Sequence, residues 1–255
     1  MKRIITALLL IPFFLYIVLW APQWAFLVTV TAVAMLCFHE YADLVARHGI
    51  AKPNLFGYAA GLLVLLLPAT GLALFVLVAI VAMALALRSR QMAQALPDEA
   101  ALLLGVAYAF GTLRSGVELR AISPYWLFFA LSLNWAGDIA ALYVGRSFGR
   151  HKLAPEVSPG KSWEGAAAST AASVIYGVFY FRWLLPTVPL AGALGLTVAA
   201  NIAGQLGDLC ESAIKRGAGV KDSGTLLPGH GGWLDRVDST LFTLPVVYLF
   251  LVLRW

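Results

Sequence analysis

Residues 4–39 read IITALLLIPFFLYIVLWAPQWAFLVTVTAVAMLCFH and contain no Asp, Glu, Lys or Arg. A helix that crosses a membrane needs roughly 20 apolar residues, so this run is too long for one helix. Ala21-Pro22-Gln23 interrupts it, and proline breaks a helix because it lacks a backbone N–H. The stretch therefore predicts two consecutive membrane helices.

Six more runs without charged residues follow along the chain. One of them, 53–87, contains the turn signal Pro68-Ala69-Thr70-Gly71 and divides in two. The pattern predicts nine helices. They lie at about 4–19, 24–45, 54–68, 71–88, 100–113, 124–145, 163–184, 188–214 and 237–253.

The composition leads to the same class of protein. Of 255 residues, 61% are hydrophobic and 12% are charged, whereas soluble domains are about 45–50% apolar and about 25% charged. A water-soluble domain of this size could not bury so much apolar surface. We therefore expect an all-α, polytopic membrane protein that forms a single membrane domain over 1–255.

The basic residues predict the orientation of these helices. Of the 18 Lys and Arg residues, 14 fall on the side of the N-terminus, and cytoplasmic loops carry such an excess. The N-terminus and the loops 146–162 and 215–236 are thus predicted to be cytoplasmic, with the C-terminus outside. Topology also accounts for the net charge of +5, so no nucleic-acid partner is expected.

Five acidic residues lie at the cytoplasmic ends of three predicted helices, where a functional role is the first interpretation. Asp208 and Glu211 are one turn apart on one face, and Ser212 shares that face. Such carboxylates suit Mg²⁺, which takes oxygen ligands and shares its shell with substrate phosphate. In the alternative interpretation, each acid pairs with a nearby Lys or Arg and holds the bundle together. The five are Asp138, Asp208, Glu211, Asp235 and Asp238.

The segment 212–238 combines these acids with phosphate-binding groups. Glycines flank His230 just before a helix start, where backbone N–H groups and the helix dipole favour an anion. Attraction to lipid headgroups would also explain basic residues here, but not the interleaved acids and glycines. The basic residues are Lys215, Arg216, Lys221 and Arg236.

The loop before residue 163 contains Gly160-Lys161-Ser162, which resembles the end of a phosphate-binding P-loop. The complete motif needs a glycine where this chain has Pro155, and no strand is expected before it, so we reject that motif. Ser158, Lys161 and Ser162 could still hold a phosphate at the start of the helix.

Segment 212–238 resembles the signature of the phosphatidate cytidylyltransferases, also called CDP-diacylglycerol synthases. The stretch from Gly149 to Gly165 resembles a second block of that family, and Gly207-Asp208-Leu209 with Glu211 a third. These blocks lie in 121–255, which the resemblance makes the catalytic half, while 1–120 matches only in hydropathy. Trp233 departs from the aliphatic residue usual in the family. The matching signature positions are Ser212, Ile214, Lys215, Arg216, Lys221, Asp222, Pro228, His230, Gly231, Gly232, Asp235, Arg236, Val237 and Asp238.

The resemblance implies that CTP and phosphatidic acid react to give CDP-diacylglycerol and pyrophosphate. It implies a bacterial-type inner membrane, an active site facing the cytoplasm, and the lipid bilayer as a partner. A second cation beside Mg²⁺ and a homodimer stay open. The implied catalytic residues are Lys215, Arg216, Lys221, His230 and Arg236; the substrate-binding residues are Ser158, Lys161, Ser162, Ser212, Asp222, Gly231 and Gly232; the metal ligands are Asp208, Asp235 and Asp238.

Two other functions stay open from the sequence. A CTP-dependent polyprenol or phytol kinase would transfer the γ-phosphate to a lipid alcohol and would need a base beside that hydroxyl. A transporter of an anionic substrate would carry charges near the midplane and often show inverted repeats. The charges instead cluster at the cytoplasmic helix ends.

Overall fold

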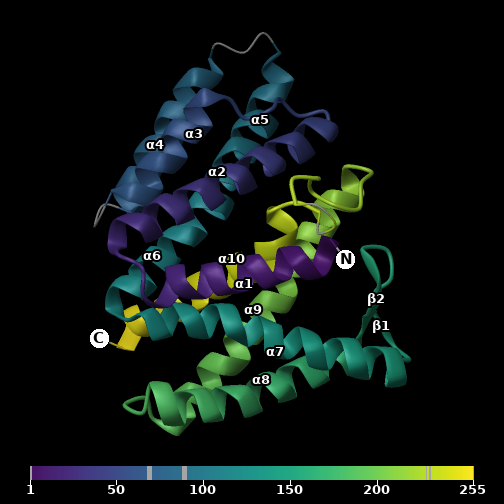
Figure 1. Cartoon of the computed structure of the whole chain (residues 1–255). Helices are drawn as coiled ribbons and strands as arrows, with labels where there is room; N and C mark the ends of the chain where they lie inside the picture. The colour runs from purple at the N-terminus through teal and green to yellow at the C-terminus, as the bar shows by residue number, and fades with distance from the viewer. Residues whose placement is uncertain (1, 68–70, 88–90, 228, 230, 255) are drawn as a thin grey trace.

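The computed structural model describes residues 2–67, 71–87, 91–227, 229 and 231–254 (Figure 1). The predicted turn at Pro68-Ala69-Thr70 and the candidate residue His230 lie outside this part of the chain. The helices are α1 (Lys2–Leu19), α2 (Gln23–Arg47), α3 (Leu55–Leu66), α4 (Gly71–Ala86), α5 (Met92–Gly105), the π-helical turn η1 (Val106–Gly111), α6 (Thr112–Ile122), α7 (Pro124–Phe148), α8 (Trp163–Leu184), α9 (Leu190–Gly217) and α10 (Leu234–Arg254).

The predicted helix 100–113 is the one whose bounds are most in error. In the structure α5, η1 and α6 follow one another without a break over 92–122. The sequence suggested an end near Arg114 because that residue is charged. Arg114 instead forms an ion pair with Glu118, one turn further on, and donates to the Leu65 carbonyl oxygen at 3.0 Å. Because the charge of Arg114 is satisfied by these two partners, the helix continues past this residue.

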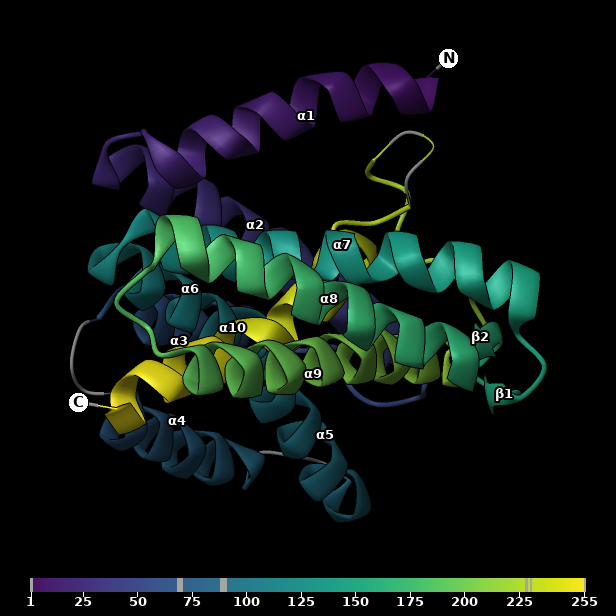
Figure 2. The ribbon, with the colours of Figure 1, turned by 90° about the horizontal axis from the view of Figure 1, so that it is seen from below.

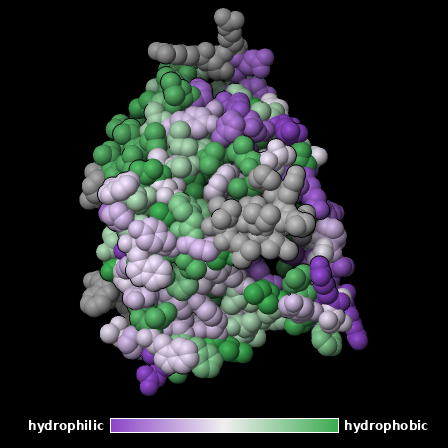
Figure 3. All heavy atoms as spheres, in the orientation of Figure 1, coloured by the Kyte–Doolittle hydropathy of each residue, from purple (hydrophilic) through white to green (hydrophobic). Residues whose placement is uncertain are grey.

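Five helical segments among the described residues are long and apolar enough to cross a membrane. Figure 3 shows hydrophobic residues over much of the body and hydrophilic residues along one edge, beside the two strands. The chain is therefore an all-α integral membrane protein, as predicted. The five segments are Gln23–Arg47, Met92–Ile122, Pro124–Phe148, Leu190–Gly217 and Leu234–Leu253.

The C-terminal helices pack as one bundle, in which α7 lies against α8, α8 against α9, and α9 against α10 (Figures 1 and 2). A buried amide joins two of them: Asn201 of α9 donates to the hydroxyls of Ser169 and Ser173 of α8, at 3.1 and 2.9 Å. Such polar contacts hold helices together where lipid offers no hydrogen bonds. Packing within this bundle therefore sets the relative positions of the ends of these helices.

The loop predicted at 146–162 contains a small hairpin that the sequence did not indicate. Strand β1 (Lys152–Ala154) pairs antiparallel with β2 (Ser158–Ser162), with Lys152 opposite Ser162 and Ala154 opposite Ser158. The expectation that no strand precedes the α8 helix is therefore wrong. Gly160-Lys161-Ser162 lies within β2 itself rather than in a loop after a strand, so the P-loop geometry is still absent here.

Candidate functional site

The candidate residues gather where α7 and α9 end and α8 and α10 begin. Arg216, at the end of α9, donates through Nε to the Val157 carbonyl of the hairpin at 3.3 Å and through its Nη1 to the Val220 carbonyl at 2.9 Å. The end of α2 joins them, because His48 Nε2 lies 3.0 Å from the Ile214 carbonyl oxygen. The two loops predicted to be cytoplasmic therefore meet at one end of the bundle, on the right in Figure 1.

A buried lysine lies at the centre of this end. Lys215 Nζ forms ion pairs with Asp235, at 2.5 Å, and with Glu211, one turn before it. The side chains of Lys215, Asp235 and Glu211 are only 9%, 6% and 0% exposed. For Glu211 and Asp235 the structure therefore shows the pairing with a base that the alternative interpretation expects.

Asp235 also fixes the loop that precedes its own helix. Its Oδ2 accepts hydrogen bonds from the backbone N–H of Gly232 at 2.8 Å and of Ser223 at 2.9 Å, and from the Ser223 hydroxyl at 3.0 Å. Both carboxylate oxygens of Asp235 are thus occupied by groups of the protein.

The second lysine pair is more open to solvent. Lys161 of β2 lies 2.7 Å from Asp208 of α9, and the two side chains are 26% and 34% exposed. Asp208 also accepts from the Ser212 hydroxyl at 3.3 Å. The carboxylates of Asp138 and Asp238 lie close enough to that of Asp208 to repel it. Lys161 thus pairs with Asp208, and Lys215 with Glu211 and Asp235, while Asp138 and Asp238 form no ion pair with a described residue.

The donor set around Asp208 has the right chemistry for Mg²⁺, since all its ligands would be carboxylate oxygens. Within the described residues, however, no three acidic, histidine or cysteine side chains are placed to hold a metal ion. Mg²⁺ keeps several waters and uses one or two carboxylates with substrate phosphate, so a pair suffices. Asp238 suits this role better than Asp235, because it forms no ion pair with any described residue and accepts a hydrogen bond from the Ser239 N–H at one oxygen, Oδ1, at 2.7 Å.

Several predicted phosphate-binding residues line one cavity of about 560 Å³. Its wall combines the basic side chains of Lys221 and Arg236 with Asp222 and the backbone of Gly231, which adopts a φ of +80°. A positive φ favours glycine, because a side chain strains the backbone there. The sequence prediction and the tertiary structure agree in bringing these four residues together.

Other predicted substrate-binding residues bond within the protein. The Ser162 hydroxyl accepts the Gly165 N–H at 3.1 Å and caps α8, and the Gly232 N–H is taken by Asp235. Ser158 faces Ala154 across the hairpin. These positions shape the site from within, and a direct contact with substrate stays a prediction for them.

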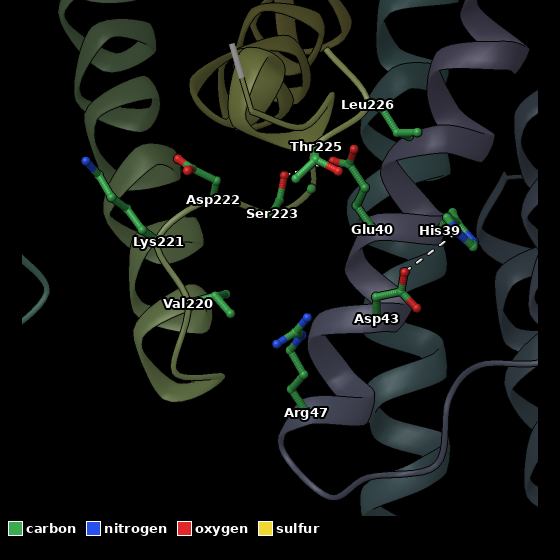
Figure 4. A pocket seen from close by; sticks show the side chains of 11 residues that line it. His39, Glu40, Asp43, Arg47, Val220, Lys221, Asp222, Ser223, Thr225 and Leu226 are labelled. Atoms are coloured by element: carbon green, nitrogen blue, oxygen red, sulfur yellow. Dashed lines mark hydrogen bonds and ion pairs between the residues drawn. The ribbon is translucent and has the colours of Figure 1, made fainter. Parts of the chain in front are cut away.

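Glu40 of α2 is a site residue that sequence reasoning missed. Its side chain is buried and accepts hydrogen bonds from the Ser223 hydroxyl and from the backbone N–H groups of Trp233 and Leu234. Figure 4 shows it on α2, with its carboxylate beside Ser223 and Thr225 in the wall of a cavity of about 670 Å³. The signal was present, since Glu40 is an acid within a predicted membrane helix, which is the criterion that selected Asp138.

A family model described as "Cytidylyltransferase family" matches residues 1–254. The match covers nearly the whole chain, so the chain belongs to the cytidylyltransferase family. The resemblance that segment 212–238 predicted is thereby confirmed, and it extends into the N-terminal half, where hydropathy alone had matched.

Curated relatives carry a more specific name. The phosphatidate cytidylyltransferase of Brucella suis is 36% identical over 258 residues, covering 97% of this chain and 92% of that protein. The protein of the same name from Bacillus subtilis is 45% identical over 141 residues, or 54% of this chain and 52% of that protein. The one from Haemophilus influenzae is 40% identical over 148 residues, covering 55% of this chain and 51% of its own length. The predicted enzyme class, a nucleotidyltransferase of this kind, is confirmed.

Proposed function

We propose that the chain transfers the CMP group of CTP to phosphatidic acid, giving CDP-diacylglycerol and pyrophosphate. Two findings together support this activity. The family model matches residues 1–254, and one cavity is lined by the signature residues Lys221, Asp222, Gly231 and Arg236. Phosphatidate resides in the membrane that the helices span, and CTP reaches the polar end of the bundle from water.

In this reaction a phosphate oxygen of phosphatidate attacks the α-phosphorus of CTP in line. The bond from that phosphorus to the oxygen of the β-phosphate breaks, and pyrophosphate leaves with the electron pair. Phosphatidate is already ionised, so no general base is required. The protein therefore acts mainly by positioning the two substrates and neutralising their charge.

The residues of the chain divide this work. Lys221 and Arg236 line the cavity and would neutralise the triphosphate. Lys161, about a quarter exposed beside Asp208, would turn to a substrate phosphate. We propose Asp208 and Asp238 as the ligands of Mg²⁺, which supplies further charge neutralisation when bound. Asp235 would bind Mg²⁺ as well only if its ion pair with Lys215 broke. His230 stays a predicted hydrogen-bond donor to the leaving pyrophosphate.

We also propose that nine helical segments cross the bacterial-type inner membrane, with the N-terminus and the site on the cytoplasmic side. The 14:4 distribution of basic residues supports this orientation. A reporter that is active only outside the cytoplasm should be active when fused after residue 255 and silent when fused after Lys221. The opposite pattern contradicts the proposed orientation.

The activity is tested with purified protein, CTP and phosphatidate by following pyrophosphate release and the lipid product. Release of pyrophosphate with formation of CDP-diacylglycerol is the expected result. A lipid-alcohol kinase would release CDP when given polyprenol or phytol instead, and a transporter would consume no CTP. Either of those results with no pyrophosphate from phosphatidate would overturn the proposal.

A further inference from the structure

Glu40 is a buried carboxyl group without a basic partner among the described residues. The residue is 3% exposed, and among the described residues no Lys, Arg or His lies within ion-pair distance of its carboxylate. A buried carboxylate is costly unless donors satisfy it. Its three hydrogen-bond donors come from Ser223, Trp233 and Leu234, which follow it by 183, 193 and 194 positions in the chain.

The three donors bind both oxygens of this carboxylate. Oε1 accepts the Trp233 N–H at 3.0 Å, while Oε2 accepts the Leu234 N–H at 2.9 Å and the Ser223 hydroxyl at 2.8 Å. Hydrogen bonds to an ionised acceptor are about twice as strong as neutral ones. Glu40 therefore fixes the loop at two points, near its start and at its junction with α10.

Two glycines show how closely the loop backbone approaches this carboxylate. A Cβ at Gly232 would overlap both the Glu40 carboxylate and the Ser223 hydroxyl, and a Cβ at Gly224 would lie 2.6 Å from Glu40 Oε1. Contacts that short do not occur for real side chains. The family resemblance implied that Gly232 binds substrate; in the structure Gly232 makes room for the Glu40 carboxylate.

Ser223 connects Glu40 with the buried lysine. Its hydroxyl lies 2.8 Å from Glu40 Oε2 and 3.0 Å from Asp235 Oδ2, so that its one proton is shared between the two carboxylates. Asp235 in turn binds Lys215. A continuous set of polar contacts thus runs from α2 through the loop to α10 and α9.

We propose that Glu40 is a positioning residue: it fixes the segment 221–227 and the start of α10, so that Lys221, Asp222 and Arg236 keep their places around the substrate cavity. The N-terminal half of the chain would then set the geometry of the catalytic half. This inference rests on the proposed function for its effect on catalysis, but its effect on the loop stands independently of any activity.

Hydrogen exchange measures the effect on the loop without using activity. In Glu40→Gln one carboxylate oxygen becomes an NH₂ group, which cannot accept a hydrogen bond and faces backbone or hydroxyl donors. We expect the amides of 222–227 and 231–234 to exchange at least roughly 10-fold faster, because each lost bond to a charged group weakens their protection. The matched control is Glu118→Gln, the same change at an acid in α6 that is paired with Arg114 outside the site.

Kinetics measure the effect on catalysis. Glu40→Gln should lower kcat per folded molecule by roughly 10- to 100-fold, with a smaller change in the KM for CTP, because the groups still bind but are misplaced. Glu40→Asp keeps the charge with a shorter reach and should restore part of the loss. Glu118→Gln should leave both constants unchanged.

A double substitution tests whether the effect passes through the loop. If Glu40 acts by holding Ser223, then Ser223→Ala in the Glu40→Gln background should cost much less than Ser223→Ala alone. Equal, independent losses would show that the two residues do not act together. If Glu40→Gln does not accumulate as folded protein, the same exchange and kinetic measurements on Ser223→Ala decide the question.

Three results would overturn the proposal. Faster exchange spread evenly over all helices would make Glu40 a general stabilising residue. A mobile loop with unchanged kcat would show that its position does not matter for transfer. Unchanged exchange would show that Glu40 does not hold the loop. If the wild-type protein itself lacks cytidylyl transfer, the proposed function fails, and the exchange result still reports on the loop.

Discussion

The two lysine–aspartate pairs of the site have the same chemistry and different surroundings. Lys215 with Asp235 and Glu211 is almost entirely buried, whereas Lys161 with Asp208 is about a quarter to a third exposed. Breaking a buried pair leaves an uncompensated charge in the interior, while an exposed pair contributes about 0–1 kcal/mol. The buried pair is therefore suited to holding helices and loop in place, and the exposed pair to opening for a substrate.

The largest effect is expected at the buried pair. Lys215→Met would leave Asp235 and Glu211 without a positive partner, which costs about 3–5 kcal/mol. Thermal unfolding in detergent should show a large loss of stability, with little folded protein at growth temperature. Lys52→Met, which breaks the exposed pair with Asp43, is the control and should change stability by less than about 1 kcal/mol. Similar stability losses in both variants would remove the distinction between the pairs.

A large catalytic effect with little loss of stability is expected at Asp208. Asp208→Asn should lower turnover by at least about 100-fold while the protein stays folded, because a carboxylate ligand and the partner of Lys161 are both weakened. EDTA should abolish wild-type turnover, and added Mg²⁺ should restore it. A variant that turns over at the normal rate with the normal Mg²⁺ requirement would exclude Asp208 as a ligand.

A smaller effect is expected at Lys161. If its ammonium binds a substrate phosphate, the contact is worth about 1.5–3 kcal/mol, so Lys161→Ala should lose roughly 10- to 150-fold in kcat/KM. Its thermal stability should stay near that of the wild type, because the pair with Asp208 is exposed. Lower stability with normal kinetics would instead show that Lys161 anchors the hairpin. Both lysines would then have a structural role, and the two pairs would differ only in burial.

The hairpin and the 218–233 loop differ in how well their structure could be predicted. Both are rich in glycine, proline and basic residues, and the sequence predicts a loop for each. The hairpin folds by backbone pairing over strands of three and five residues, which are too short to give an alternating pattern. The second loop is held by carboxylates of Glu40 and Asp235, one of which comes from a distant helix.

The sequence by itself determined the family, the membrane character and most of the helices. Runs without charge define helices because a charged side chain in lipid is costly, and this signal is local. The predicted helix 163–184 coincides with α8, and 4–19 differs from α1 by two residues at one end. Lys221, Asp222, Gly231 and Arg236 were identified from one continuous stretch, so no folding was needed to group them.

Only the tertiary structure decided which charges pair. Lys161 could have met any of several acids, and it meets Asp208 because the fold brings the hairpin beside α9, where Arg216 also bonds to the Val157 carbonyl oxygen. Lys215 takes Glu211 from its own helix and Asp235 from the next. Glu40 reaches Ser223, 183 positions away in the chain. Hydrophobicity determines where helices form, but it does not specify which helices pack against one another. Ion pairs and hydrogen bonds need partners at a defined distance and orientation, and only the packing of the folded chain supplies these.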